Sequence, residues 1–72
     1  MSDKHFTKFI EYLYFLSHNK PLPREALDHQ LKGDWILFRE FHLSGDLLII
    51  YRIHDENIEL IRIGSHNQLF KT

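Results

Sequence analysis

The sequence predicts an α+β fold in which an N-terminal amphipathic helix packs on a three-stranded antiparallel β-meander. Three observations lead to this prediction. Apolar residues in the first quarter of the chain recur every three or four positions, as they do on one face of a helix. From Trp35 onward the apolar period changes to two, which is the period of β-strands. Polar turn segments at residues 43–46 and 54–57 divide this second part into three strands.

The predicted helix spans residues 5–18. Its apolar positions follow the helical spacing and are Phe6, Phe9, Ile10, Leu13 and Leu16. The helix should end before Pro21, because proline disfavours helical backbone in the residue that precedes it. Residues 21–23 should then run extended, and residues 24–31 should form a loop with a short helical turn. The segment Lys-Gly-Asp at residues 32–34 is a turn signal.

The three strands are expected at residues 35–42, 47–54 and 58–63. The second is apolar on both faces, so it should lie in the centre of the sheet. Alternation places Glu40 and His42 on one face of the first strand, and the same rule groups Leu60 with Arg62 on the third. Residues 66–70 should form a tail that packs back on the sheet.

Length and composition restrict the class of protein. At 72 residues the chain is expected to form one domain, residues 1–72. It has no cysteine, which excludes disulfides and thiolate metal sites. No apolar run approaches the roughly 20 residues of a membrane span, and the N-terminus predicts no secretory signal, so a cytoplasmic protein is expected. The net charge is −1 and there are six histidines, so RNA binding would need a local basic cluster that protonated histidines could supplement.

Several residues have the chemistry needed to cut RNA without a metal. Histidine can remove the proton of a 2′-hydroxyl and can protonate a leaving 5′-oxygen, because its ordinary pKa lies near neutral pH. Arginine can bind a phosphate through two parallel hydrogen bonds. The candidates are His29, His42, His54, His66, Glu40, Asp46, Arg39, Arg52 and Arg62.

Topology favours one group of these candidates. In a three-stranded meander the end of the first strand and the end of the third strand point the same way. His42, Asp46 and His66 are therefore expected to converge on one rim of the sheet. His54 should lie at the opposite end of the second strand and should not join them.

Structural roles compete with these assignments. A single histidine is more often a surface or hydrogen-bonded structural residue than a functional one. Arg39 and Arg62 could pair across strands with Glu40 or Glu59, which contributes well under ~1 kcal/mol when the pair is exposed. Trp35 and Phe70 are more often core residues than platforms for an unpaired base.

Two other kinds of site have little support. No His-x-x-x-His pair or cysteine partner gives the spacing of a zinc site, so no metal or other cofactor is expected. Ser44 and Ser65 lie in plain turns without a nucleophile elbow, which disfavours Ser-His-Asp catalysis.

Five strings of the sequence, in order and in register, resemble the YafQ branch of the RelE superfamily of bacterial toxins. They are PLP at residues 21–23, DHQLKGDW at 28–35, FREFH at 38–42, DLLIIYRI at 46–53 and RIGSHNQLF at 62–70. A single string would be weak, but five with unbroken spacing are specific. The resemblance implies a shortened RelE-like fold.

The resemblance also implies an activity and partners. Members of this family are the toxins of type II toxin–antitoxin modules and are ribosome-dependent mRNA endoribonucleases that need no metal. The implied partners are a cognate antitoxin protein, the ribosome and messenger RNA. The family's functional positions fall on His29, His42, Asp46, His66 and Phe70.

The resemblance suggests a role for each of these residues. His42 and His66 would transfer protons, and Asp46 would act as a base or orient a histidine. His29 would bind RNA or assist catalysis, and Phe70 would position a base. The spacing does not decide which histidine is the acid and which is the base.

Three charged residues complete the expected site. Glu40 stands where the family usually has aspartate, which keeps the charge but moves it by about one methylene group. Arg62 matches a basic position suited to phosphate, and Arg39 is a second candidate for phosphate binding.

The N-terminal part departs from the family pattern. Relatives begin with an extra strand and helix, whereas only four residues precede the predicted helix here. The sheet is therefore expected to have an open edge and exposed apolar surface, which a homodimer or an antitoxin could cover. The alternative function is a truncated, catalytically weak or inactive toxin that acts as an antitoxin-binding or dimerising module.

Overall fold

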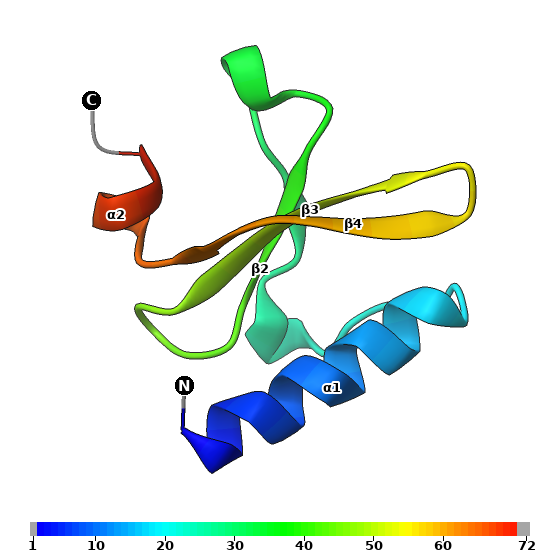
Figure 1. The fold of residues 1–72 in the computed structure, drawn as a ribbon, viewed down its shortest axis with the longest axis vertical. Helices are drawn as coiled ribbons and strands as arrows, with labels where there is room; N and C mark the ends of the chain where they lie inside the picture. Colours follow the sequence, from blue (N-terminus) through cyan, green and yellow to red (C-terminus); the bar gives the residue numbers. More distant parts are fainter. Residues whose placement is uncertain (1, 71–72) are drawn as a thin grey trace.

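The computed structural model describes residues 2–70, with the side chain of Phe70 outside the described part. The elements in chain order are helix α1 (Asp3–Ser17), the 3-10 turn η1 (Arg24–Ala26), strand β1 (His29–Gln30), the 3-10 turn η2 (Gly33–Trp35), strands β2 (Arg39–His42), β3 (Leu48–His54) and β4 (Asn57–Gly64), and helix α2 (His66–Phe70) (Figure 1). The strands form one antiparallel sheet in the order β1-β2-β3-β4. The predicted α+β fold is confirmed, with four strands among the described residues in place of three.

Helix α1 forms where the apolar spacing predicts it. It begins at a capping serine, since Ser2 Oγ accepts a 3.2 Å hydrogen bond from the backbone N–H of His5. It ends where Asn19 adopts a positive φ of 55°. Its buried residues face the sheet. The rings of Tyr12 and Phe41 pack edge to face, with their centroids 5.6 Å apart.

The sheet has a core on each side. The larger core lies between the sheet and α1 and consists of Tyr12, Leu16, Ala26, Phe41, Leu43, Ile49 and Tyr51. The smaller core on the opposite face consists of Leu48, Ile50 and Leu69, with Leu31, Trp35 and Phe38 packed against it. Strand β3 contributes to both cores, so its predicted central position is confirmed.

The first predicted strand is too long. Residues 35–38 lie outside β2, because Gly33 adopts a positive φ of 64° and the chain makes a 3-10 turn at residues 33–35. The segment predicted as a loop at residues 24–31 contains η1 and the two-residue strand β1. Strand β1 pairs with β2 so that His29 lies opposite Glu40. Two residues are too few to show a period, so only the long-range pairing reveals this strand.

A β-bulge changes the face to which Arg62 belongs. Ile50 lies opposite Arg62, but the next residue, Tyr51, lies opposite Leu60, which leaves Ile61 as the extra residue. Leu60 and Arg62 therefore occupy opposite faces, and the prediction that groups them on one face is wrong. Arg62 belongs to the face of Glu40, since both lie opposite Ile50.

The β3–β4 hairpin and the C-terminal tail agree with the sequence. Asp55 and Glu56 both have positive φ, 50° and 66°, as in the type I′ turn that suits a two-residue hairpin. The tail at residues 66–70 forms α2 and packs back on the sheet through Leu69, which is 8% exposed.

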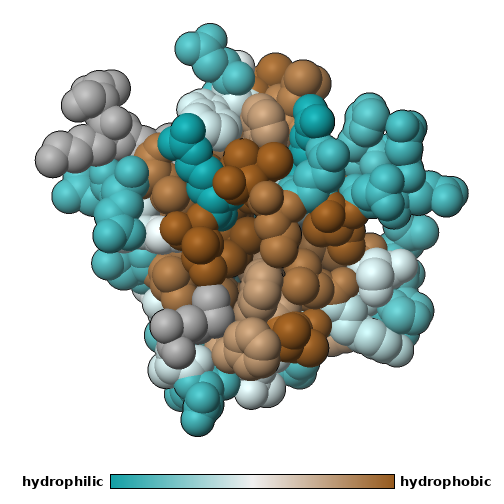
Figure 2. Space-filling model, viewed as in Figure 1, coloured by the Kyte–Doolittle hydropathy of each residue, from teal (hydrophilic) through white to brown (hydrophobic). Residues whose placement is uncertain are grey.

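Apolar side chains also gather on one face of the surface, over α1 and β4 (Figure 2). The exposed residues there are Phe6, Ile10 and Tyr14 of α1 and Leu60, Ile61 and Ile63 of β4. Strand β4 is an edge of the described sheet. The expected open edge and apolar surface are thus present in residues 2–70. None of the described helices has the length and apolarity to span a membrane.

Candidate active site

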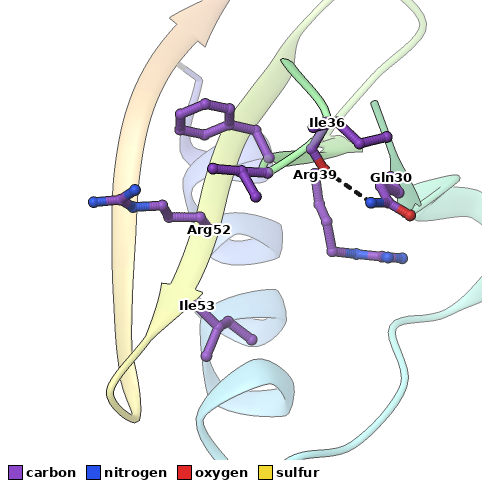
Figure 3. A pocket seen from close by; sticks show the side chains of 7 residues that line it. Gln30, Ile36, Arg39, Arg52 and Ile53 are labelled. Atoms are coloured by element: carbon purple, nitrogen blue, oxygen red, sulfur yellow. Dashed lines mark hydrogen bonds between the residues drawn. The ribbon is translucent and has the colours of Figure 1, made fainter. Parts of the chain in front are cut away.

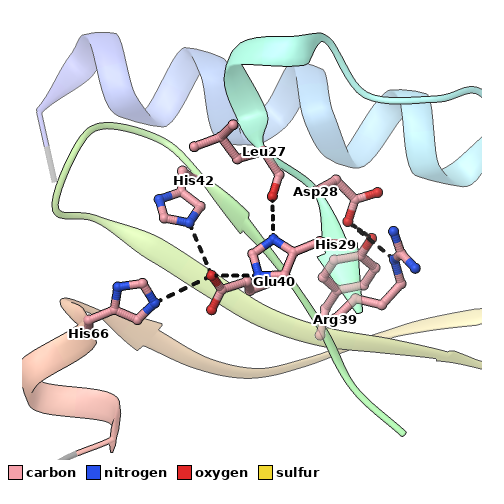
Figure 4. Close-up of polar contacts among 8 residues, drawn as sticks. Leu27, Asp28, His29, Arg39, Glu40, His42 and His66 are labelled. Carbon is pink, nitrogen blue, oxygen red and sulfur yellow. Dashed lines mark hydrogen bonds and ion pairs between the residues drawn. The ribbon is translucent and has the colours of Figure 1, made fainter. Parts of the chain in front are cut away.

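Three histidines surround one buried carboxylate (Figure 4). Glu40, in β2, is 1% exposed. Its Oε1 atom lies 3.2 Å from Nε2 of His29, 3.1 Å from Nε2 of His42 and 3.3 Å from Nε2 of His66. These four residues, referred to below as the His–Glu cluster, come from β1, β2 and α2.

Three elements position the side chains of the cluster. His42 follows Glu40 by two residues on β2, so alternation directs both side chains to the same face. His29 reaches that face because β1 pairs with β2 in a register that sets it opposite Glu40. His66 is the first residue of α2, which follows β4 after the single residue Ser65.

The turn that places His66 is tightly built. Ser65 Oγ accepts a 3.1 Å hydrogen bond from the N–H of Gln68, and Gln68 Oε1 accepts a 3.0 Å bond from the N–H of Ser65. This reciprocal pair is a capping box at the start of α2. A Cβ atom on Gly64 would lie 2.8 Å from Gln68 Oε1. Glycine at position 64 therefore leaves room for the Gln68 side chain to complete this capping box beside His66.

The ring of His29 has an acceptor at each nitrogen. Its Nδ1 lies 2.7 Å from the carbonyl oxygen of Leu27, and its Nε2 faces the Glu40 carboxylate. The turn at Leu27, whose φ is 51°, brings this carbonyl to the ring. Two oxygen acceptors therefore fix the orientation of this ring beside the buried carboxylate.

The contacts of Glu40 all pass through one oxygen. Its other oxygen, Oε2, is buried and has no hydrogen-bond partner among the described residues. A buried carboxylate needs hydrogen-bond donors to offset the loss of water, and imidazole N–H groups can provide them. The cluster can therefore orient three rings around one carboxylate. His29 and His66 have side chains that are 52% and 57% exposed, so a substrate can reach them.

A second polar network supports the strand that carries His29. Asp28 Oδ1 accepts a 2.6 Å hydrogen bond from the hydroxyl of Tyr51 and a 3.3 Å bond from Nε of Arg39. Burial, followed by the hydrogen bond to Asp28, raises the pKa of Tyr51. Arg39 is thus paired with Asp28 and not with Glu40. Sequence reasoning did not single out Asp28 or Tyr51, because no local pattern connects residues 23 positions apart.

Of the three residues predicted to meet at one rim of the sheet, the structure brings two together. His42 and His66 come together, with ring centroids 5.7 Å apart. Asp46 is exposed in the turn before β3, and in residues 2–70 no hydrogen bond or ion pair joins its carboxylate to the histidines. His54 lies at the far end of β3 beside Asp55, as expected.

Arg62 connects the sheet to α2. Its Nη1 donates a 3.2 Å hydrogen bond to the carbonyl oxygen of Leu69, and its guanidinium lies 5.1 Å from the centre of the Trp35 ring. These contacts give Arg62 a structural role, because they hold α2 against the sheet. This role is additional to the phosphate binding expected from the sequence. The side chain of Phe70, the expected base-positioning residue, lies outside the described part of the chain.

A separate hollow lies away from the His–Glu cluster (Figure 3). Its lining includes Gln30, Arg39 and Arg52, and none of the cluster residues lines it. The two arginines in its wall are already paired with carboxylates, Arg39 with Asp28 and Arg52 with Glu59. The cluster is therefore the better candidate for chemistry.

Comparison with known proteins supports the resemblance noted in the sequence. The family model described as the bacterial toxin of type II toxin–antitoxin systems, YafQ, matches residues 1–71. A putative toxin YafQ of Haemophilus influenzae is 39% identical over 66 residues, which are 86% of this chain and 65% of the relative. The mRNA interferase toxin YafQ of Escherichia coli K12 is 36% identical over 63 residues, which are 85% of this chain and 68% of the relative. The chain thus spans slightly less than two thirds of the Haemophilus relative.

Solved structures show the same fold. A copper-bound mutant toxin from Helicobacter pylori superposes with a TM-score of 0.85 at 36% identity, covering 97% of this chain and 76% of that one. YafQ from Escherichia coli gives a TM-score of 0.80 at 30% identity, covering 90% of this chain and 73% of that one. The Escherichia coli DinJ–YafQ toxin–antitoxin complex gives 0.77 at 32% identity, covering 90% and 72%.

Proposed function

Because the chain belongs to the YafQ family of bacterial type II toxin–antitoxin toxins, we propose that it is an endoribonuclease that cleaves messenger RNA at the His–Glu cluster. The observation that carries this proposal is the contact of one buried carboxylate oxygen, Glu40 Oε1, with three imidazole nitrogens at 3.1–3.3 Å. Imidazoles held in this way can both accept and donate protons near neutral pH.

The proposed reaction divides the work between two histidines. One of His42 and His66 removes the proton of the 2′-hydroxyl, whose oxygen then attacks the adjacent phosphorus. The other protonates the 5′-oxygen as its bond to phosphorus breaks. Glu40 orients both rings and stabilises the imidazolium that forms, because its carboxylate contacts both Nε2 atoms. His29, whose side chain is 52% exposed beside Glu40, would bind the RNA near the phosphate.

Other residues have proposed roles that the cluster geometry does not require. Asp46 would act as a base or orient a histidine once RNA is bound. Arg62 and Arg39 would contact phosphates along the RNA, and Phe70 would position a base. For the arginines this means sharing or giving up their contacts with Leu69 O and Asp28.

The descriptions of the relatives indicate which partners to propose. The Escherichia coli relatives are an mRNA interferase toxin and a toxin in complex with the antitoxin DinJ. By this likeness the proposed partners are a cognate antitoxin protein and ribosome-bound messenger RNA, and the proposed location is the cytoplasm. Two solved relatives from Helicobacter pylori are metal-bound, whereas the proposed proton transfers use only imidazole and carboxylate groups.

The second candidate function is a non-catalytic module that binds an antitoxin or a second copy of itself. The exposed apolar residues of α1 and β4, at the open sheet edge, favour it. The net charge of −1 also gives less general attraction for RNA than a basic protein would have.

A cleavage assay on ribosomes carrying a defined message separates the two functions. The wild-type chain is expected to cut the message, and His66→Ala should reduce the rate by about 10²- to 10⁴-fold, the usual contribution of an acid–base residue. His54→Ala is the matched control, because His54 lies at the far end of β3. Circular dichroism should show that both variants keep the fold.

The outcomes are distinct. A wild-type chain that captures an antitoxin but leaves the message intact would establish the second function. Full activity in His66→Ala would refute the proposed roles of the cluster.

A further inference from the structure

Strand β4 is an edge of the described sheet and carries an exposed apolar surface. Leu60, Ile61 and Ile63 are 48%, 39% and 50% exposed. The outer backbone groups of an edge strand are open to pairing with another strand. Figure 2 shows an apolar centre on this side of the molecule, with hydrophilic side chains around it. An apolar patch with a polar rim is typical of a protein–protein interface.

A groove joins this strand to helix α1. Its lining includes Ile10, Leu13 and Tyr14 of α1 together with Ile58 and Leu60 of β4. Ile10 and Tyr14 are about as exposed as the residues of β4, at 50% and 53%. The edge strand and the helix therefore form one continuous apolar surface that a partner can cover.

We propose that this surface binds a second copy of the chain, with β4 pairing antiparallel to β4 of the other copy about a twofold axis. The strands of the two copies would then run in the order β1-β2-β3-β4-β4-β3-β2-β1. The axis passes between positions 60 and 61, so that Leu60 of one copy lies opposite Ile61 of the other. A twofold contact uses the same patch on both copies, so the strand must be complementary to itself. The pairing is independent of RNA cleavage and holds for either candidate function.

The apolar residues of β4 match across the axis. Ile58 packs against the core between the sheet and α1. Ile63 lies opposite Ile49, which belongs to the same core. In the proposed register Ile58 of one copy lies opposite Ile63 of the other, so two apolar residues meet on the α1 face. The bulge at Ile61 is present in both strands, so the two bulges meet at the axis and the pairing continues on either side.

The charged residues of β4 are complementary in the same register. Glu59 of one copy would lie opposite Arg62 of the other, and the symmetry provides this ion pair twice. Both residues belong to the face opposite α1, since Glu59 lies opposite Arg52 and Arg62 lies opposite Ile50. Both also have atoms left for the new contact. Glu59 pairs with Arg52 through Oε1, and Arg62 donates to the carbonyl oxygen of Leu69 through Nη1.

A shift of one residue in either direction removes this match. With the axis at Leu60, Ile58 of one copy would lie opposite Arg62 of the other. With the axis at Ile61, Leu60 would lie opposite Arg62. Either shift sets an apolar residue against a charge and directs the two side chains to opposite faces. The charges and the faces of β4 therefore select one register.

The mass of the purified chain, without RNA or antitoxin, gives the first test. Light scattering and analytical ultracentrifugation should show a dimer of twice the 8.8 kDa chain that dissociates on dilution. Ile61→Lys should weaken the dimer by at least about tenfold, because two like charges then meet beside the axis. Leu37→Lys is the control, since Leu37 is 74% exposed in the turn before β2. A wild-type monomer at every concentration, including one that binds only an antitoxin through β4, would overturn the proposal. So would a dimer that Ile61→Lys leaves intact.

Two charge-reversal variants test the register. Glu59→Arg sets two arginines against each other across the seam, and Arg62→Glu sets two glutamates against each other. Each variant alone should therefore dimerise at least about tenfold more weakly than the wild type. Mixed in equal amounts, the two variants restore both ion pairs and should form a mixed dimer in native mass spectrometry. A mixture that stays monomeric, although circular dichroism shows both variants folded, would refute the register.

A cross-linking variant decides the case if Arg62→Glu does not fold, since Arg62 also holds α2. The chain has no cysteine, so Ile61→Cys introduces the only thiol, and it lies beside the axis. Mild oxidation should join two copies of Ile61→Cys in high yield, whereas Leu37→Cys should remain mostly unlinked. Equal cross-linking of the two variants would show random collision and would refute the proposed pairing.

Discussion

The hydroxyl of Tyr51 donates a 2.6 Å hydrogen bond to Asp28 Oδ1, and this contact joins the central strand β3 to the residue before His29. Strand β1 has only two residues, so its own pairing with β2 provides little restraint. The buried tyrosine therefore helps to hold His29 at the His–Glu cluster.

Tyr51→Phe should reveal this role. The change removes the hydrogen bond while Asp28 keeps its contact with Arg39, so we expect the free energy of unfolding to fall by about 1–2 kcal/mol. Cleavage of the ribosome-bound message should fall several-fold, because His29 is less well placed. Urea unfolding and the cleavage assay provide the measurements. Tyr14→Phe is the matched control, since Tyr14 is 53% exposed on α1; an equal loss in both variants would contradict the prediction.

The same tyrosine should make stability depend on alkaline pH. Burial and the bond to Asp28 raise the pKa of Tyr51 above its ordinary value of 10.0. As the pH rises above that value, the unfolded chain loses the Tyr51 proton while the folded chain keeps it. The folded state then binds more protons, so its stability falls with rising pH. Unfolding measured from about pH 9 to about pH 11 should show a steeper decline for the wild type than for Tyr51→Phe, and parallel curves would refute this.

Gly64→Ala should disturb the position of His66. The added Cβ would lie 2.8 Å from Gln68 Oε1 and 3.2 Å from Leu69 Cδ2, so the Gln68 side chain must shift and its capping hydrogen bond with the N–H of Ser65 is disturbed. We expect a loss of stability of about 1–2 kcal/mol and a clear loss of cleavage. Gly45→Ala is the control, because nothing lies within 4 Å of its Cβ position. Thermal unfolding and the cleavage assay together test the prediction, which would be wrong if Gly64→Ala kept full activity.

Glu40→Gln should separate charge from shape at the centre of the cluster. The amide has nearly the same size but cannot stabilise an imidazolium by charge, so cleavage should fall on the order of 10²-fold. The variant should remain folded, as judged by circular dichroism. Glu59→Gln is a matched control on β4, where the ion pair of Glu59 with Arg52 is partly exposed. Unchanged cleavage in Glu40→Gln would remove Glu40 from the proposed mechanism.

Local patterns in the sequence determined much of the fold. The three-and-four spacing of apolar residues located α1, because one face of a helix must be buried. The apolar character of residues 47–54 on both faces placed β3 in the centre. The polar residues between β3 and β4 located the hairpin. Histidine and carboxylate chemistry also selected the candidate residues.

Only the tertiary structure decided how these residues meet. The pairing of β1 with β2 brings His29 to Glu40, and the bulge at Ile61 moves Arg62 to the face of the cluster. Both depend on hydrogen bonds between strands, and no periodicity within one segment records them. The sequence alone predicted a rim formed by His42, Asp46 and His66, whereas the structure has buried Glu40 as the shared partner of three histidines. A buried carboxylate gathers donors from every element that reaches it, and that requirement is visible only once the chain has folded.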